Sequence, residues 1–258
     1  MAFNSAGLLD IFGKRRLSQI PFRPGLCPGE RLQRESKILN SSATVEYVPD
    51  ADTGVGAAKM IYNDLINGSL PDNLAGKLYN VIADLDEVGA TLYRRLVEGK
   101  PIVRGVKSMS LRTRSEQAPN PDSRVTLAEE KDALGINRIQ LDWRLTEIDK
   151  RTVRTLVRSI GAEFGRLNYG RVRVPDWLAI DDDAWSPELI GGNHHMGTTR
   201  MSENPKQGVV DKNCRVHSVG NLYVAGSSVF TTSGYANPTL TIVALAVRLA
   251  DHLKQQFA

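Results

Sequence analysis

Residues 191–201 read GGNHHMGTTRM, the most specific stretch of this chain. It is followed in order by GVVD at 208–211, RVH at 215–217, NLYVAGSS at 221–228 and GYANPTLT at 234–241. Residues 170–237 hold three of the four histidines and two of the three tryptophans, with little helical periodicity. Loops of this kind usually carry binding or catalytic residues. We therefore expect a loop-rich functional segment that includes a strand at Leu222–Ala225 and is followed by a long closing helix from Pro238.

This ordered series resembles the C-terminal signature of the glucose-methanol-choline (GMC) family of FAD-dependent alcohol and sugar oxidoreductases. Each fragment alone is a weak signal, but their order and spacing over roughly the last seventy residues are similar to those of the family. Upstream, PDSRVTL at 121–127 resembles the family's substrate-domain strand, although the glycine commonly found after its arginine is absent. The resemblance implies an FAD-dependent dehydrogenase or oxidase acting on the CH–OH group of an alcohol or carbohydrate, with sugars and glycosides favoured.

The resemblance places His194 at the position of the catalytic base and Asn237 at that of its partner. Oxidising an alcohol by hydride transfer requires removal of the hydroxyl proton, and a neutral imidazole near physiological pH suits this task. The amide of Asn237 can donate a hydrogen bond to the developing alkoxide, while the hydride passes to N5 of the flavin. Adjacent residues of an extended segment point to opposite faces, so we assign His195 to substrate binding instead.

The resemblance also implies two short segments that bind the cofactor, FAD. Gly226 and Ser227 follow the expected strand, where the family's backbone approaches the ribityl and phosphate part of the flavin, and glycine permits this because it lacks a side chain. Asn237, Pro238 and Thr239 begin the closing helix, with Asn at the N-cap and Pro at the first helical position. The partial positive charge of this helix end would stabilise reduced flavin. No histidine spacing predicts a metal site.

The ADP-binding unit of such enzymes, a strand, a G-x-G-x-x-G turn and a helix, has no counterpart in the sequence. The nearest match, GVGAAK at 54–59, has lysine where the third glycine or alanine belongs, and we interpret it as a loop entering a helix. We therefore expect the chain to be the C-terminal half of a larger enzyme, or to assemble with a separate FAD-binding chain. The expected divisions are an irregular segment at 1–42, a substrate-binding domain at 43–204 and a C-terminal segment of the FAD-binding domain at 205–258.

Hydrophobic periodicity indicates a mixture of helices and strands. The spacing of apolar residues predicts helices over Val55–Ile66 and Asn73–Val97. Thr146 and Asp149 resemble a capping box that opens a helix reaching about Leu167. Strands are predicted at Thr44–Val48, Val106–Arg114, Arg124–Leu127 and Arg138–Leu145.

The predicted fold class is therefore α+β. A mixed β-sheet with covering helices would form the substrate domain, and a C-terminal strand and helix would complete an FAD-binding, Rossmann-like domain. Without the rest of that domain, the closing segment should expose an apolar surface.

Composition excludes several classes of protein. With 258 residues, of which 41% are hydrophobic and 24% charged, the chain has an ordinary globular composition. Cys27 and Cys214 lie far apart, which removes disulfide scaffolds, thioredoxin chemistry and iron-sulfur clusters. The net charge of +4 is dispersed, so nucleic-acid binding is not expected. The apolar run Leu240–Val247 is too short to span a bilayer, and the start does not resemble an export signal, so we expect a cytoplasmic protein.

Two other functional interpretations stay open. The chain could be a degenerate homologue that survives as a non-catalytic module binding a small molecule, or a component that assembles with a separate FAD-binding chain. Bound flavin in the purified protein would favour assembly or a complete site, whereas a colourless, ligand-binding protein would favour the module. The sequence names neither the substrate nor the electron acceptor.

Overall fold

The computed structural model describes residues 11–12, 15–17, 20–97, 106–180, 182 and 184–257. The fold class is α+β, as predicted, but the described strands form separate two-stranded sheets where one mixed sheet was expected between Thr44 and Leu145. The chain forms two compact units that alternate along the sequence. The domain boundaries proposed from the sequence stay a prediction. Unit 1 comprises Met1–Cys27, Ser42–Thr113 and Leu156–Val174, and unit 2 comprises Pro28–Ser41, Arg114–Thr155 and Pro175–Ala258.

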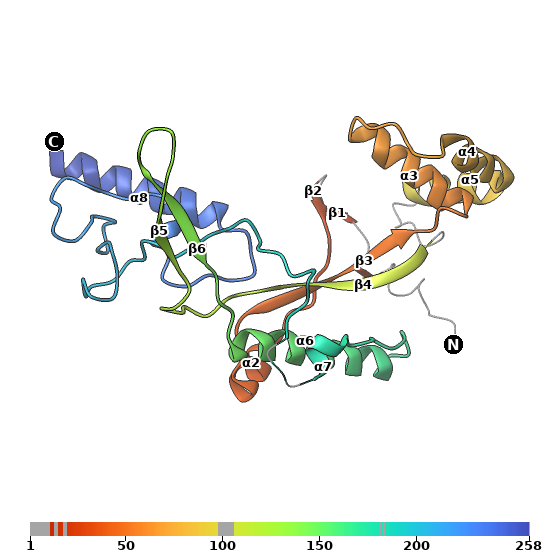
Figure 1. The fold of residues 1–258 in the computed structure, drawn as a ribbon. Helices are drawn as coiled ribbons and strands as arrows, with labels where there is room; N and C mark the ends of the chain where they lie inside the picture. The colour runs from red at the N-terminus through yellow and green to blue at the C-terminus, as the bar shows by residue number, and fades with distance from the viewer. Residues whose placement is uncertain are drawn as a thin grey trace. The chain divides into compact units, whose positions relative to one another are not determined.

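The core of unit 1 is a strand pair covered by a helix. Strand β3 (Ser41–Pro49) pairs with β4 (Val106–Ser115), and Figure 1 shows the two side by side. The C-terminal part of α6 (Glu147–Arg166) packs against them through its apolar stripe. Both strands lie where the alternating pattern predicts them. The buried cluster consists of Phe12, Ala43, Val45, Leu156, Ile160 and Phe164.

The segment 1–42, predicted to be irregular, contains regular structure in its described part. Strands β1 (Arg15–Leu17) and β2 (Ile20–Phe22) form a short antiparallel pair, and α2 covers Glu30–Ser36. Leu26 adds a backbone bridge to Ala43 of β3, with N···O distances of 2.8 Å in both directions. Residues 1–10, on which the absence of an export signal was argued, lie outside the described residues.

Three helices follow β3, where the sequence predicts two. They are α3 (Gly54–Ile66), α4 (Leu74–Ala83) and α5 (Leu85–Leu96). The predicted helix over Asn73–Val97 is interrupted at Asp84, whose backbone leaves the helical region with φ −110° and ψ 32°. Its carboxylate oxygen Oδ2 accepts a hydrogen bond of 2.7 Å from the backbone N–H of Gly54. The prediction of one helix is wrong because the spacing of apolar residues carries no information about this long-range hydrogen bond.

The two glycines of the GVGAAK segment serve helix packing. Thr53 caps α3, because its side chain accepts a hydrogen bond from the N–H of Gly56 at 3.2 Å. A Cβ atom on Gly54 would lie 2.6 Å from Cβ of Asp84, and one on Gly56 would lie 1.9 Å from the carbonyl oxygen of Asp50. The interpretation as a loop entering a helix is confirmed. Neighbouring atoms occupy the space that a phosphate-binding turn would leave open.

Substituting Gly56 tests this close packing. Glycine to alanine inside a helix normally raises stability by about 0.5–1 kcal/mol. At Gly56 the methyl group would collide with the backbone of Asp50, so we expect Gly56→Ala to lower the free energy of unfolding by about 1–3 kcal/mol instead. Urea unfolding followed by circular dichroism measures both. The matched control is Gly89→Ala in α5, where a Cβ meets no atom within 4 Å and a gain is expected. A gain at both positions would contradict the close packing at Gly56.

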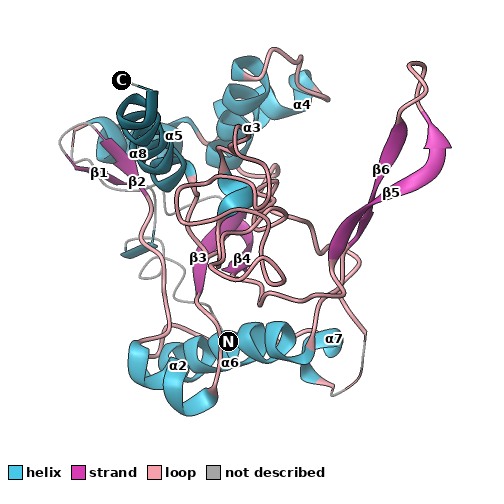
Figure 2. Cartoon of the chain, turned by 90° about the vertical axis from the view of Figure 1, so that its left-hand side faces the viewer, coloured by secondary structure: helices cyan, strands magenta, loops and turns pink. Residues whose placement is uncertain are grey.

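Unit 2 contains a β-hairpin and the start of α6. Strands β5 (Arg124–Lys131) and β6 (Asn137–Asp142) are antiparallel, with an irregularity between Leu127 and Lys131 (Figure 2). The half of the capping box that Asp149 supplies is present, since the N–H and Oγ1 of Thr146 both donate to Oδ2 of Asp149, at 2.7 and 2.8 Å. The N–H of Asp149 donates to the backbone carbonyl oxygen of Thr146 instead of to its hydroxyl. The other described elements of the unit are α2, the short α7 (Asp176–Ala179), the 3-10 turn η1 (Ser227–Val229) and α8 (Thr239–Phe257).

The C-terminal loops fold around a small core of their own. Val210, Cys214 and Val229 are buried, and α8 contributes Leu245 and Leu249 to this cluster. The strand predicted at Leu222–Ala225 is reduced to one antiparallel bridge, between Arg215 and Tyr223. The segment is hydrogen-bonded to the turn that contains Cys214 and Val216, and not to an extended strand. A ladder of several paired residues therefore does not form. Among the described residues, no helix has the length and apolar character needed to cross a membrane.

The buried Lys150 holds the segment around residue 182. Its ammonium group donates to Oδ1 of Asp182 at 3.1 Å and to the carbonyl oxygen of Ala184 at 2.9 Å, and its side chain is 3% exposed. The hydrogen bond from Lys150 holds the pKa of the Asp182 carboxyl below its usual value, aided by the backbone N–H of Ala184. This carboxylate therefore stabilises the folded chain when ionised.

Acid should remove the contribution of Asp182. Because its pKa is lowered on folding, the stabilisation is present above the ordinary carboxyl pKa of about 4 and is lost as the pH falls through the folded value. We expect Asp182→Asn to unfold at lower urea concentration than the parent at pH 7, with the difference closing in strong acid. Urea midpoints across this pH range measure it. An unchanged difference at all pH values would assign the loss to shape instead of charge.

Candidate active site

The histidine segment lies beside the segment that follows the expected strand. The N–H groups of Gly197, Thr199 and Met201 donate to the carbonyl oxygens of Ser227, Ser228 and Val229 at 3.2, 2.9 and 2.9 Å. These bonds run in the same order along both segments, from every second residue of GTTRM to successive residues of GSSV, so the two stretches are held side by side. Two motifs that are separate in the sequence therefore form one structural block.

Hydroxyl groups strengthen this block from both sides. Oγ of Ser227 donates to the carbonyl oxygen of His195 at 3.0 Å, and Oγ1 of Thr199 donates to Oγ of Ser228 at 2.8 Å. The structure thus brings the predicted residues His195 and Ser227 together. Sequence reasoning missed the Thr199–Ser228 pair, although the doubled hydroxyl residues in both motifs were the available signal.

The geometry of His194 suits a base. Its side chain is exposed, and ring atom Nδ1 contacts the carbonyl oxygen of Gly192. A carbonyl oxygen only accepts hydrogen bonds, so this contact places the proton of a neutral ring on Nδ1 and leaves the lone pair on Nε2. Asn193 between them has a left-handed backbone, with φ 56°, which produces the tight turn. His195 is also exposed, so exposure alone does not separate the two histidines.

In the part of the chain that the structure describes, no hydrogen bond joins the predicted residues at the start of α8 to this contact network. The helix begins at Thr239, one residue later than predicted, and the N–H of Ile242 donates to the carbonyl oxygen of Pro238 at 2.9 Å. Asn237 and Thr239 are exposed, whereas Pro238 is buried. Among the described residues, no hydrogen bond joins Asn237 to either neighbouring histidine. Their partnership therefore stays a prediction.

Gly226 has the open geometry expected of a close approach to a ligand. Its φ of 108° lies in the region that side chains disfavour, and a Cβ atom there would meet no atom within 4 Å. Because the space is open, the backbone conformation, not crowding, requires the glycine. Gly197 on the histidine segment also has positive φ, 77°, but a Cβ there would lie 3.3 Å from the carbonyl oxygen of Phe230. Gly226 is thus the position in this pair that is accessible to a bound molecule.

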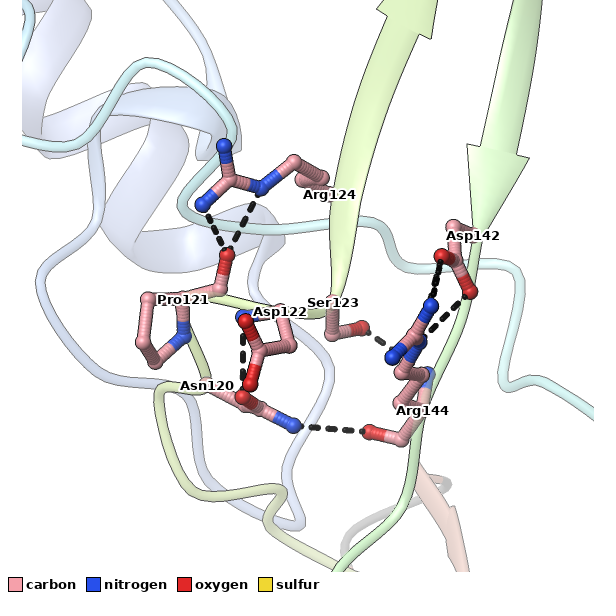
Figure 3. A network of polar contacts seen from close by, with 7 residues as sticks. All are labelled: Asn120, Pro121, Asp122, Ser123, Arg124, Asp142 and Arg144. Atoms are coloured by element: carbon pink, nitrogen blue, oxygen red, sulfur yellow. Dashed lines mark hydrogen bonds and ion pairs between the residues drawn. The ribbon is translucent and has the colours of Figure 1, made fainter.

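The PDSRVTL motif forms an ordered turn at the base of the β5–β6 hairpin (Figure 3). Nε of Arg124 donates to the carbonyl oxygen of Pro121 at 2.7 Å, and the N–H of Asp122 donates to Oδ1 of Asn120 at 2.9 Å. At the end of β6, the guanidinium of Arg144 donates hydrogen bonds to the carboxylate of Asp142. These bonds hold the pKa of the Asp142 carboxyl below its usual value. The side chain of Arg124, the arginine of the motif, is therefore hydrogen-bonded to the backbone of its own turn.

Comparison with known proteins assigns these features to a class of oxidoreductase. Residues 119–246 match the family model described as GMC oxidoreductase, a range that includes the hairpin, the histidine segment and the N-terminal part of α8. The chain belongs to the GMC oxidoreductase family, which confirms the resemblance drawn from the motifs.

The similar proteins are themselves dehydrogenases and oxidases. Fructose dehydrogenase large subunit of Gluconobacter japonicus is 31% identical over 137 residues, 53% of this chain and 23% of that protein. Paromamine 6'-oxidase of Streptomyces fradiae is 29% identical over 222 residues, 82% of this chain and 32% of that protein. The 6'''-hydroxyparomomycin C oxidase of Streptomyces lividus is 30% identical over 231 residues, 84% and 37% of the two chains. The chain thus spans about a third or less of the length of most of these relatives.

Proposed function

We propose that this chain supplies the substrate-side and catalytic part of an FAD-dependent oxidoreductase acting on CH–OH groups. The observation that supports this most is the block in which three backbone hydrogen bonds join the histidine segment to the GSSV segment, inside the region that matches the family. A loop held at three backbone positions can present a side chain with little loss of conformational entropy on substrate binding.

His194 is proposed as the general base. With the neutral ring's proton on Nδ1, Nε2 accepts the hydroxyl proton of the substrate. The side-chain amide of Asn237 donates to the same oxygen as negative charge develops there, which requires the start of α8 to lie near His194 when substrate is bound. His195 binds substrate, and its carbonyl oxygen is held by Ser227.

The residues present fit one end of a flavin. Gly226 offers an open backbone position, Ser227 lies next to it, and Asn237, Pro238 and Thr239 lead into a 19-residue helix whose N-terminal dipole favours negative charge. These residues would hold the isoalloxazine and ribityl side, and bound FAD would supply the hydride acceptor. The nucleotide half needs a glycine turn and helix N-terminus for its pyrophosphate, which the sequence lacks.

A larger enzyme is proposed for the same reason. The 231 residues aligned with the Streptomyces lividus relative correspond to 37% of that protein, so most of such a protein lies outside the alignment. Helix α8 has no buried residue, and Leu240, Val243 and Val247 on one side of it are 82%, 54% and 56% exposed. This apolar surface was expected for a segment that completes an FAD-binding domain supplied by another part of the polypeptide or by a separate chain.

Sugars or glycosides are the proposed substrate class. The names of the relatives describe oxidation of fructose, of paromamine and of 6'''-hydroxyparomomycin C, and C-glycoside 3-oxidase of Arthrobacter globiformis is 44% identical over 64 residues. Substrates of this kind carry several hydroxyl groups, which suits a polar, exposed histidine segment.

The proposal is tested on a joined protein, in which this chain replaces the matched region of the Streptomyces lividus relative. We expect it to reduce an electron-accepting dye with members of a panel of sugars, aminoglycosides and simple alcohols, and to prefer the first two. A soluble, flavin-containing joined protein that oxidises none of them would contradict the proposed function. Preference for simple alcohols would contradict the substrate class alone.

A further inference from the structure

The β5–β6 hairpin carries an apolar face that its own unit leaves uncovered. Val125 pairs with Leu141 and Leu127 pairs with Ile139, so the four side chains share one face of the two strands. They are 42%, 53%, 70% and 75% exposed in the order Val125, Leu141, Leu127 and Ile139. We call these four residues the hairpin face.

The opposite side of the hairpin is polar, which makes the pattern one-sided. Thr126 pairs with Gln140 there, and Arg124 pairs with Asp142. Strands with alternating character normally place their apolar side chains against a covering layer. The sequence predicts such a cover for this sheet, and the described residues of unit 2 do not provide it.

The hairpin is nevertheless fixed at its base. Nε1 of Trp143 donates to Oε1 of Gln117 at 2.7 Å, and the N–H of Arg144 donates to Oγ of Ser123 at 3.1 Å (Figure 3 shows the second). Isolated two-stranded hairpins are marginally stable in water, and further strands or a packed layer are needed for independent stability. An anchored hairpin with an open apolar face can therefore pack against a further layer of structure.

We propose that the hairpin face is a docking surface for the FAD-binding part of a GMC oxidoreductase, which lies outside the part of the enzyme that this chain matches. The proposal rests on the proposed function only in naming that part as the FAD-binding one. The family match begins just before β5, and the match to the Streptomyces fradiae relative covers 32% of that protein, so a large part remains to supply the cover. A second copy of this chain fits less well. A stable dimer buries about 800 Å² on each partner, more than four side chains provide.

Cysteine labelling tests the docking surface directly. Ile139→Cys places a thiol on the hairpin face, and Gln140→Cys places one on the polar side of the same strand. Both are made with Cys27→Ser, because Cys27 is exposed, whereas Cys214 is buried and can stay. The rate of reaction with a soluble aromatic disulfide reagent is measured in this chain alone and in the joined protein. Leu127→Cys on the facing strand provides a second probe of the same face.

We expect the thiols at 139 and 127 to react freely in the chain alone and at least about tenfold more slowly in the joined protein, with a smaller change at 140. Equal rates in both proteins would overturn the proposal. Protection already present in the chain alone would also overturn it, because the cover would then come from this chain or from a second copy, which light scattering distinguishes. Flavin content of the joined protein reports separately on the proposed function, so bound flavin with an unprotected hairpin face would refute the docking surface alone.

Discussion

We expect His194→Ala to lower the turnover of the joined protein by about 10²–10⁴-fold, the usual effect of removing a general base. Flavin should remain bound, because the proposed flavin contacts are made by Gly226, Ser227 and the start of α8. The loss should shrink at high pH, where hydroxide replaces the missing base. Steady-state dye reduction between pH 6 and 10, together with the flavin absorbance of each variant, measures both effects.

His195→Ala is the matched control for this prediction. The backbone carbonyl oxygen of His195 accepts from Oγ of Ser227, and that contact does not involve the imidazole, so the loop should keep its position. We expect a rise in the substrate concentration needed for half-maximal rate and a turnover within about tenfold of the parent. Equal losses of turnover, or a larger loss for His195→Ala, would mean that the roles of the two histidines are exchanged.

The second large effect concerns the chain alone. We expect the 258 residues to bind FAD weakly and to show no measurable dye reduction, whereas the joined protein retains flavin through purification. The physical reason is the pyrophosphate, which is held in such enzymes by backbone N–H groups at a glycine turn and helix N-terminus. The candidate turn at Gly54 and Gly56 cannot serve, because its space is filled by Asp50 and Asp84.

Equilibrium dialysis with FAD and a dye-reduction assay over the same substrate panel test this second prediction. Gly226→Val serves as a control within the joined protein, since a branched side chain at φ 108° forces the backbone to move and should reduce flavin retention. Stoichiometric flavin or clear turnover from the chain alone would show that its own residues complete the site.

Local patterns predicted many of the elements of this protein. The capping box of Thr146 and Asp149 depends on residues three apart, so the start of α6 was readable without tertiary information. Strands were likewise predicted at β3 to β6, with boundaries that shift by a few residues, and in β6 the alternation of apolar residues indicated the strand. The break at Asp84 was not predictable in this way, because it depends on a hydrogen bond to Gly54, 30 positions earlier in the chain.

The sequence by itself determined the family and the candidate residues, since a motif needs only the order and spacing of residue types. What tertiary structure decided is which of those residues meet. It joined the histidine segment to Ser227 and Ser228, because backbone groups buried between two loops must find hydrogen-bond partners in each other. It also left the hairpin face of β5 and β6 open, because alternation in a strand fixes which side chains share a face but not which surface will cover them.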